Sequence, residues 1–173
     1  MIPDFNASGV LPPFTGDSPG ANLADSSPYV TSMTEVAQRF ATSEERREIL
    51  RGLIDYRAAL RDAGVVAGFQ LVDGSFVEAC ETSRGRPPGD VDIVTFAHLP
   101  VAGNEIQQFL RDNVALIDRT VVKERFKCDS FFVNLGNDPR LVVVDTMYWF
   151  GLFSHQRDTF MWKGMLRVPL MSD

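Results

Sequence analysis

The apolar positions of the chain recur with two different periods, and each period predicts one kind of element. Residues 42–64 and 106–117 repeat apolar side chains every three or four positions, which is the spacing of one face of an amphipathic helix. A shorter helix is predicted at 34–40. Thr42 and Glu45 have the spacing of a capping box, so they mark the start of the long helix.

Four short apolar runs predict strands. They cover residues 65–72, 91–96, 126–135 and 141–150. The segment 136–139 reads Gly-Asn-Asp-Pro, a tight turn that would join the last two strands into a hairpin. Helices and strands in this order predict an α/β (α+β) fold, with a small mixed sheet flanked by helices.

The first 32 residues lack this periodicity. Pro12, Pro13 and the run Ser18-Pro19-Gly20 break any regular element, so residues 1–32 predict an extended arm, either draped over the domain or flexible. Residues 33–173 are predicted to form a single domain. A chain of 173 residues is long enough to bury a core of its own. The segment 81–89 is rich in Gly and Pro and predicts a loop.

The charge balance limits the partners that the chain is expected to bind. The net charge is −6, a poor match for long duplex nucleic acid, whose binding depends on neutralising phosphates. A small nucleotide stays compatible, because a metal ion can supply positive charge locally. The arginines of the long helix are predicted to be a solvated flank: Arg46, Arg47, Arg51, Arg57 and Arg61.

The sequence offers no sign of a membrane span or of a zinc site. No apolar stretch is long enough to cross a bilayer, and the start, Met1–Asn6, has no basic or apolar signal region, so we expect a cytoplasmic protein. Cys80, Cys128, His98 and His155 have no zinc-type spacing. Metal chemistry would therefore rest on oxygen ligands, which favour Mg²⁺ with Mn²⁺ as the alternative.

Two aspartates at the start of a predicted strand are the strongest chemical signal. Asp90 and Asp92 are one residue apart, so they project to the same face of the strand. Carboxylates this close repel each other unless a cation lies between them. The preceding strand ends at Gly74-Ser75, where a bend without a Cβ lets the backbone approach a phosphate. Each signal alone is common, but together they predict a metal and phosphate site.

A third carboxylate is expected from a neighbouring strand, and there are two candidates. Asp129 opens its predicted strand, as Asp90 does, and we prefer it. Asp145 lies inside the predicted strand 141–150, where an unpaired carboxylate would be costly. A structural role for Asp145, such as pairing with an arginine, is as good an interpretation as a functional one.

These motifs resemble a known superfamily. Gly74-Ser75, Asp90-x-Asp92 and a later strand aspartate are similar to the signature of the DNA polymerase beta-type nucleotidyltransferases, and most of all to the minimal nucleotidyltransferases of prokaryotes. Four further segments resemble a group of small, mostly uncharacterised bacterial proteins of that superfamily: 1–6, 9–13, 73–77 and 163–167. The resemblance covers most of the chain.

The resemblance implies a reaction and a set of site residues. A nucleoside monophosphate would pass from a nucleoside triphosphate such as ATP to an acceptor hydroxyl on a protein, an RNA end or a small molecule. Asp90 and Asp92 would bind both magnesium ions, and Asp129 would complete one metal site and help to activate the acceptor. Gly74 and Ser75 would hold the triphosphate, and Lys163, in the aromatic tail, is a further candidate for contact with it.

The sequence also departs from the superfamily pattern. The connection between Gly-Ser and Asp-x-Asp is long, with residues 83–86 as the apparent extra segment, and Arg84 and Arg86 either reach the triphosphate or are solvated. The acceptor-binding domain of larger relatives is missing. The alternative to an enzyme is therefore a catalytically silent binding module, such as a nucleotide sensor or the antitoxin of a toxin–antitoxin pair. A plain scaffold with a solvated acidic strand end is the third reading.

Overall fold

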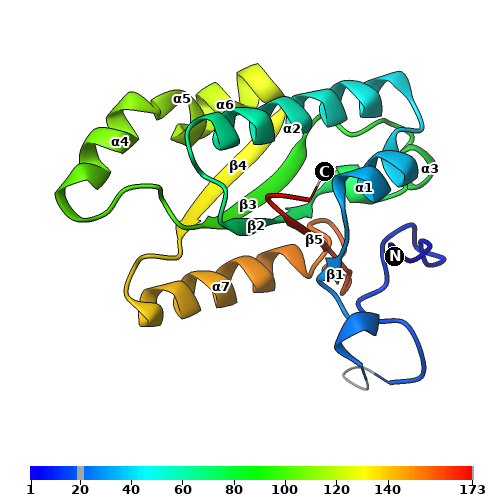
Figure 1. The fold of residues 1–173 in the computed structure, drawn as a ribbon. Helices are drawn as coiled ribbons and strands as arrows, with labels where there is room; N and C mark the ends of the chain where they lie inside the picture. Colours follow the sequence, from blue (N-terminus) through cyan, green and yellow to red (C-terminus); the bar gives the residue numbers. More distant parts are fainter. Residues whose placement is uncertain (19–21, 173) are drawn as a thin grey trace.

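A five-stranded mixed sheet organises the fold (Figure 1). The protein is seen in a computed structural model that describes residues 1–18 and 22–172. The strand order is β1-β5-β2-β3-β4, with β2 antiparallel to both β5 and β3, and with parallel pairs β1–β5 and β3–β4. The strands are β1 (Tyr29–Val30), β2 (Gly68–Asp73), β3 (Val91–Ala97), β4 (Cys128–Asn134) and β5 (Leu166–Pro169).

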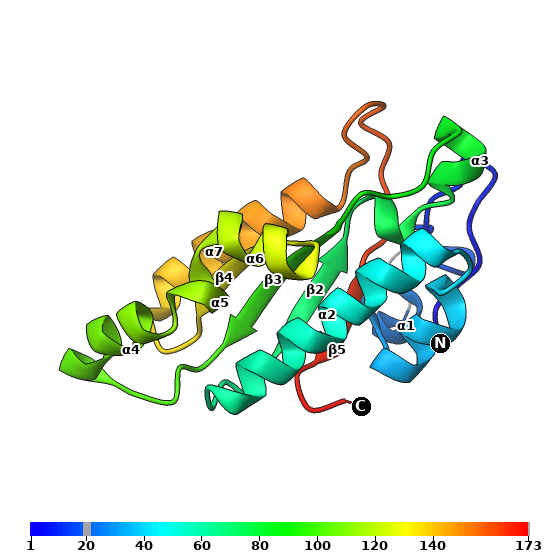
Figure 2. The same cartoon turned by 90° about the horizontal axis from the view of Figure 1, so that it is seen from above.

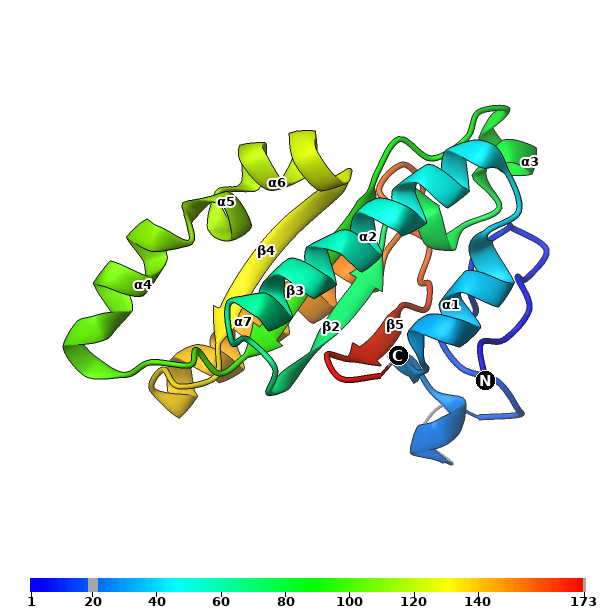
Figure 3. The same cartoon turned by 45° about the horizontal axis from the view of Figure 1, so that its top comes forward.

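The helices lie on both faces of the sheet. Figures 1 and 3 show α2 and α4 to α6 over one face, while α7 lies on the other. No helix in the described part of the chain has both the length and the apolarity that a bilayer span requires. The helices are α1 (Met33–Phe40), α2 (Glu44–Asp62), α3 (Cys80–Arg84), α4 (Ile106–Asp112), α5 (Val114–Ile117), α6 (Arg119–Phe126) and α7 (Pro139–Phe153).

Two apolar clusters fill the space on either side of the sheet. The larger one lies beneath α1, α2 and α6 and includes Leu53, Tyr56 and Ile93, which are fully buried. Helices α2 and α6 pack closely at Gly52, since a Cβ at this position would overlap the carbonyl of Phe126. The smaller cluster lies beneath α7 and includes Phe96 and the other members Leu71, Val94, Val133, Phe153 and Met165.

Most of the predicted elements are confirmed, and with them the mixed α/β fold. The three predicted helices correspond to α1, α2 and the pair α4 and α5, and the first three predicted strands correspond to β2, β3 and β4. The cap of α2 is one residue later than predicted, because the Ser43 hydroxyl accepts the Arg46 N–H at 3.3 Å. The predicted loop 81–89 is also wrong in its first half, which forms the end of α3.

The fourth predicted strand and its hairpin are wrong, because residues 139–153 form helix α7. The Asp138 carboxylate accepts the Arg140 N–H at 2.9 Å, and Pro139 occupies the first turn, where it needs no N–H donor. Trp149 packs on Phe131 of β4, with ring centroids 4.2 Å apart. A strong helix start and one apolar anchoring face therefore outweigh the strand preference of the valine run.

The sequence reading missed both β1 and β5. Strand β5 comes from the tail and lies between β1, which belongs to the arm, and β2. The arm is docked, because Val10 and Leu11 are fully buried and the Leu11 carbonyl accepts the Gly164 N–H at 2.8 Å. Residues 19–21 of the predicted arm, including Pro19-Gly20, lie outside the described residues, as does residue 173.

Two of the five arginines predicted as a solvated flank are buried. Arg46 is 3% exposed and Arg57 is 1% exposed. Arg46 donates to the carbonyls of Phe76 and Glu78 at 2.7 and 2.6 Å. Arg57 donates to the Gln70 side chain at 2.8 Å. Both guanidinium groups therefore hold α2 against the segments on either side of the Gly-Ser bend.

Candidate functional site

Three aspartates lie side by side across β2, β3 and β4 at one end of the sheet. The register pairs Asp73 with Asp92 and Asp92 with Asp129. Register partners on neighbouring strands point to the same face. Two residues further along β3 and β4, Val94 and Phe131 lie beneath α7. The acidic row therefore lies on the side of the sheet that α7 covers. We call Asp73, Asp92 and Asp129 the acidic row.

The Gly-Ser bend lies directly against the acidic row. Gly74 has a φ of +79°, and a Cβ at this position would overlap the carboxylate of Asp92. Glycine is therefore required twice, by the backbone conformation and by the neighbouring oxygen. Ser75 opens a short 3₁₀ helix that runs from Ser75 to Val77. The fold thus brings together the two motifs that the sequence placed on separate strands.

Two basic side chains from α6 reach the same carboxylates. Arg119 binds Asp129 through two hydrogen bonds, one of them from Nη2 to Oδ2 at 2.7 Å and the other from Nε to Oδ1. The Lys123 Nζ lies 2.6 Å from Asp90 Oδ2 and 3.4 Å from Asp129 Oδ2. The Arg119 guanidinium, followed by Lys123, lowers the pKa of Asp129. Asp90 and Asp129 are therefore close enough to share one ammonium group.

Open space adjoins these two basic side chains. A pocket of about 420 Å³ is lined by Arg119, Thr120, Lys123 and Glu124. The Lys123 side chain is 48% exposed, so it is free to turn into solvent. This open space therefore adjoins the two cations that bind Asp129 and Asp90.

Asp92 is the carboxylate with no direct partner. Among residues 1–18 and 22–172 it has no hydrogen bond or ion pair. Burial, followed by the charges of Asp90 and Asp129, raises its pKa from 3.8 to about 6. A cation near Asp92 would reverse this effect. Carboxylate oxygens are the ligands that Mg²⁺ and Mn²⁺ prefer, so the donor set fits such an ion.

The carboxylates are not arranged as a closed metal cage. Within the described residues, no three Asp, Glu, His or Cys side chains are placed so that one ion could bind them together. Arg119 and Lys123 of α6 instead form ion pairs with the carboxylates of Asp129 and Asp90. An ion shared by Asp90, Asp92 and Asp129 would require Lys123 to turn away.

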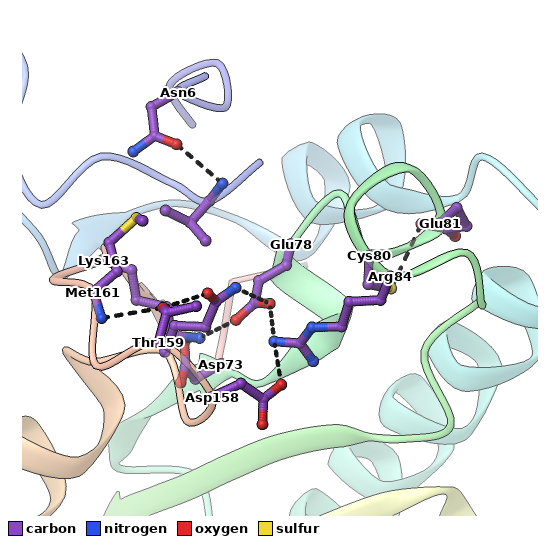
Figure 4. Close-up of polar contacts among 12 residues, drawn as sticks. Asn6, Asp73, Glu78, Cys80, Glu81, Arg84, Asp158, Thr159, Met161 and Lys163 are labelled. Atoms are coloured by element: carbon purple, nitrogen blue, oxygen red, sulfur yellow. Dashed lines mark hydrogen bonds and ion pairs between the residues drawn. The ribbon is translucent and has the colours of Figure 1, made fainter. Parts of the chain in front are cut away.

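A buried ionic network joins Asp73 of the acidic row to Lys163 and Glu78 (Figure 4). Lys163 is 3% exposed, and its ammonium lies 2.9 Å from Asp73 and 2.8 Å from Glu78. Arg84 and Gln156 also donate to Glu78, at 2.9 and 3.0 Å. Burial raises the pKa of Asp73 to about 7, against the opposing effect of Lys163. Although Asp73 Oδ1 is within ion-pair distance, it accepts no well-directed hydrogen bond.

The placement of Lys163 differs from the simple expectation of a phosphate contact. Its ammonium is already bound by two carboxylates and shielded from solvent. Arg84, the other basic candidate, pairs with Glu78 and lies 3.6 Å from Asp158. The structure therefore gives both side chains a positioning role beneath the Gly-Ser bend.

Sequence reasoning missed four residues of this region: Asp73, Glu78, Arg119 and Lys123. Asp73 had a signal, since it directly precedes the Gly-Ser bend and ends its strand. The α6 residues had none, because only the packing of α6 beside the edge strand β4 brings them to Asp129. Asp145, the alternative third carboxylate, lies in the middle of α7 and outside the acidic row.

The sequence pattern of the family of unknown function DUF6932 matches residues 3–169. The chain belongs to this family. The DUF6932 match runs from the arm to the end of β5, so it includes the acidic row, the Gly-Ser bend, α6 and Lys163. No curated protein and no solved structure matches the chain.

Proposed function

We propose that this DUF6932 protein is a metal-dependent nucleotidyltransferase that moves a nucleoside monophosphate from a nucleoside triphosphate to an acceptor hydroxyl. The acceptor would be a protein side chain, an RNA end or a small molecule. One observation carries the proposal. Asp92 and Asp129 are register neighbours on β3 and β4, and the Gly74 bend packs on the Asp92 carboxylate. This is the juxtaposition that the resemblance to nucleotidyltransferases requires.

Each side chain has a role in this proposal. Asp90 and Asp92 would bind the divalent ions, and Asp129 would complete one ion site and orient the acceptor hydroxyl. Bound Mg²⁺ would supply positive charge to the attacking and leaving oxygens. The Gly74-Ser75 bend would take the triphosphate against its backbone, since no Cβ blocks the approach. Lys163 would keep Asp73 and the bend in place rather than touch the phosphates.

The two basic residues of α6 are compatible with a triphosphate substrate. Arg119 and Lys123 neutralise Asp129 and Asp90, and Lys123 is exposed enough to turn toward an incoming phosphate. Divalent ions would take the place of Lys123 at the acidic row. Lys123 would then contact the triphosphate together with Arg119.

The test is transfer of label. The purified protein is incubated with each α-³²P nucleoside triphosphate, Mg²⁺ and a cell extract, beside the double variant Asp92→Asn/Asp129→Asn and the exposed control Asp62→Asn. We expect label in acceptors with the wild type and Asp62→Asn, and a loss of more than about 100-fold in the double variant. Equal labelling by all three proteins would exclude the enzyme.

A second candidate is a catalytically silent binding module, such as a nucleotide sensor or an antitoxin. The observation that favours it is that Arg119 and Lys123 already hold two of the predicted metal ligands. Isothermal titration with a non-hydrolysable triphosphate, with and without Mg²⁺, separates the two. Binding that does not need Mg²⁺, together with no transfer of label, supports the silent module.

A further inference from the structure

The outward side of α7 is covered by large apolar side chains. Leu141, Val144, Tyr148 and Leu152 follow one another at spacings of three and four residues, which places them in one row along the helix. A second row beside the first consists of Val143, Met147 and Phe150. All seven are exposed, with Met147 at 70%, Tyr148 at 62% and Val144 at 61%. We call these two rows the α7 face.

The α7 face carries no charge beyond its first turn. Helix α7 has two charged residues, Arg140 and Asp145. Arg140 lies in the first turn and pairs with Asp138 at 2.7 Å, while Asp145 is half-buried beside the inward side of the helix. Gly151 lies between the two rows, and a Cβ there would meet nothing within 4 Å. The exposed Arg140–Asp138 pair therefore stands at the N-terminal end of the face, and the rest of the face, from Leu141 to Leu152, is uncharged.

The exposure of this face does not reflect a loose helix. On its inward side, Trp149 packs on Phe131 and on Phe153, which is 4% exposed. Figure 1 shows α7 on the opposite side of the sheet from α2 and α4 to α6, so none of these helices covers it. Figure 2 shows the same helices from above. An anchored helix with a bare apolar side is typical of an interaction surface.

The area of the α7 face matches what a stable dimer needs. Seven side chains at these exposures present at most on the order of 700 Å² of surface, since an aromatic side chain has about 150–250 Å² and the aliphatic ones have less. The largest apolar patch of an ordinary monomer is about 300–600 Å². A standard interface buries about 800 Å² per partner. The α7 face therefore supplies most of the area that each half of a symmetric pair needs.

We propose that two copies of this chain associate through the α7 face in a symmetric dimer, with α7 packed against α7 of the second copy. A symmetric interface uses the same patch twice, so any charge on it would meet its own kind near the axis. Beyond the Arg140–Asp138 pair at its N-terminal end the α7 face has none, although the chain as a whole carries a net charge of −6. Charge depletion and high apolarity are also the mark of homodimer interfaces.

A membrane surface fits the face less well. Helices that lie on membranes carry Lys and Arg along the polar side, which attract anionic lipid. In α7 the sole basic residue is Arg140, and Asp138 already neutralises it. An acidic protein with such a helix would be repelled by anionic lipid, whereas a second copy meets a surface whose one exposed charged pair is neutral as a whole.

The first test is the oligomeric state of the full chain, measured by sedimentation equilibrium. Met147→Glu places a charge in the centre of the face, and Met171→Glu is the matched control, since Met171 is 64% exposed and lies outside α7. We expect the wild type and Met171→Glu to be dimers, and Met147→Glu to dissociate with a Kd raised on the order of 100-fold. A monomeric wild type, or equal behaviour of the two variants, would overturn the proposal.

The second test does not depend on loss of association. Met147 lies near the middle of α7, so in a symmetric pair its two copies lie close to the axis. Met147→Cys should form an intermolecular disulfide under mild oxidation at least 10-fold faster than Met171→Cys, while Cys80 and Cys128 stay buried. Equal rates, or a wild type that stays monomeric and floats with lipid vesicles, would contradict the dimer.

Discussion

The folded protein disfavours the ionised form of the Asp92 side chain. Asp92 is half-buried between two other carboxylates, and its pKa is raised to about 6. A carboxyl whose folded-state pKa lies above its unfolded value stabilises the protein fully below the unfolded pKa and loses that contribution as the pH rises through the folded pKa. The native state is therefore less stable above pH 6 than it would be without this carboxylate. Such a cost is typical of a residue kept for binding rather than for folding.

We predict that Asp92→Asn makes the protein more stable at pH 8 but not at pH 4. The amide keeps the shape of the side chain and has no charge to bury. The free energy of unfolding should rise by about 1–2 kcal/mol at pH 8, because the shift of the pKa is worth about 1.4 kcal/mol per pH unit and the group keeps some contact with solvent. Urea unfolding of both proteins from pH 4 to pH 8 measures it. A difference that does not change with pH would contradict this account.

We predict that Gly74→Ala destabilises the protein more than Gly85→Ala. Both glycines have a positive φ, +79° and +64°, so alanine is strained at either position by about 1 kcal/mol. A Cβ at Gly74 also overlaps the Asp92 carboxylate, whereas a Cβ at Gly85 meets open space. We expect a loss of about 3 kcal/mol at Gly74 and about 1 kcal/mol at Gly85, measured by urea unfolding. Equal losses of unfolding free energy in the two variants would mean that the bend is not in close contact with Asp92.

The elements show where sequence patterns are enough and where they fail. Strands β2, β3 and β4 are predicted well, because each is a short apolar run bounded by turn residues. The run Leu141–Phe150 has the same look but folds as part of α7. Its apolar residues lie on both sides of the helix, so the helical period is hidden, and the signal that decides is the Asp138-Pro139 start. Strands β1 and β5 are too short to show a period at all.

The residues of the candidate site also fall into those that the sequence predicts and those that it does not. Gly74, Ser75, Asp90 and Asp92 belong to neighbouring strand ends, so alternation along a strand is enough to bring them together. Asp129 required only that β4 lie beside β3. The ion pairs of Arg119, Lys123 and Lys163 could not be predicted, because each depends on where a distant segment packs. Sequence gives the acids of this site but not the cations that hold them.

At the level of elements, the docked arm makes a prediction of its own. Leu11 is fully buried beside the tail, whereas Leu23, in the same arm, is 89% exposed. Leu11→Ala should reduce the free energy of unfolding by about 2–5 kcal/mol through lost burial and an unfilled cavity. Leu23→Ala should change it by less than about 0.5 kcal/mol. Both are measured by urea unfolding, and a Leu11→Ala variant as stable as the wild type would show that the arm is not docked.

The whole molecule should respond to divalent ions if the acidic row binds them. A ligand that binds only the native state stabilises it, so Mg²⁺ at about ten times its Kd adds about 1.4 kcal/mol. For a chain of this size that corresponds to about 3–5 °C in the Tm. We predict such a rise for the wild type at pH 8, and less than a third of it for Asp92→Asn. Equal rises in both proteins would place the ion elsewhere.

Strand β5 gives the molecule an order of assembly. It is near the end of the described chain, yet it lies between β1 and β2 and bonds to both. While the ribosome is still making residues 1–165, the place between those two strands stays open, and the arm has no strand to pair with. Strands β2, β3 and β4 can form their ladder earlier. The nascent chain therefore carries an incomplete sheet until residues 166–169 have left the ribosome, which is the stage at which a holding chaperone would find it.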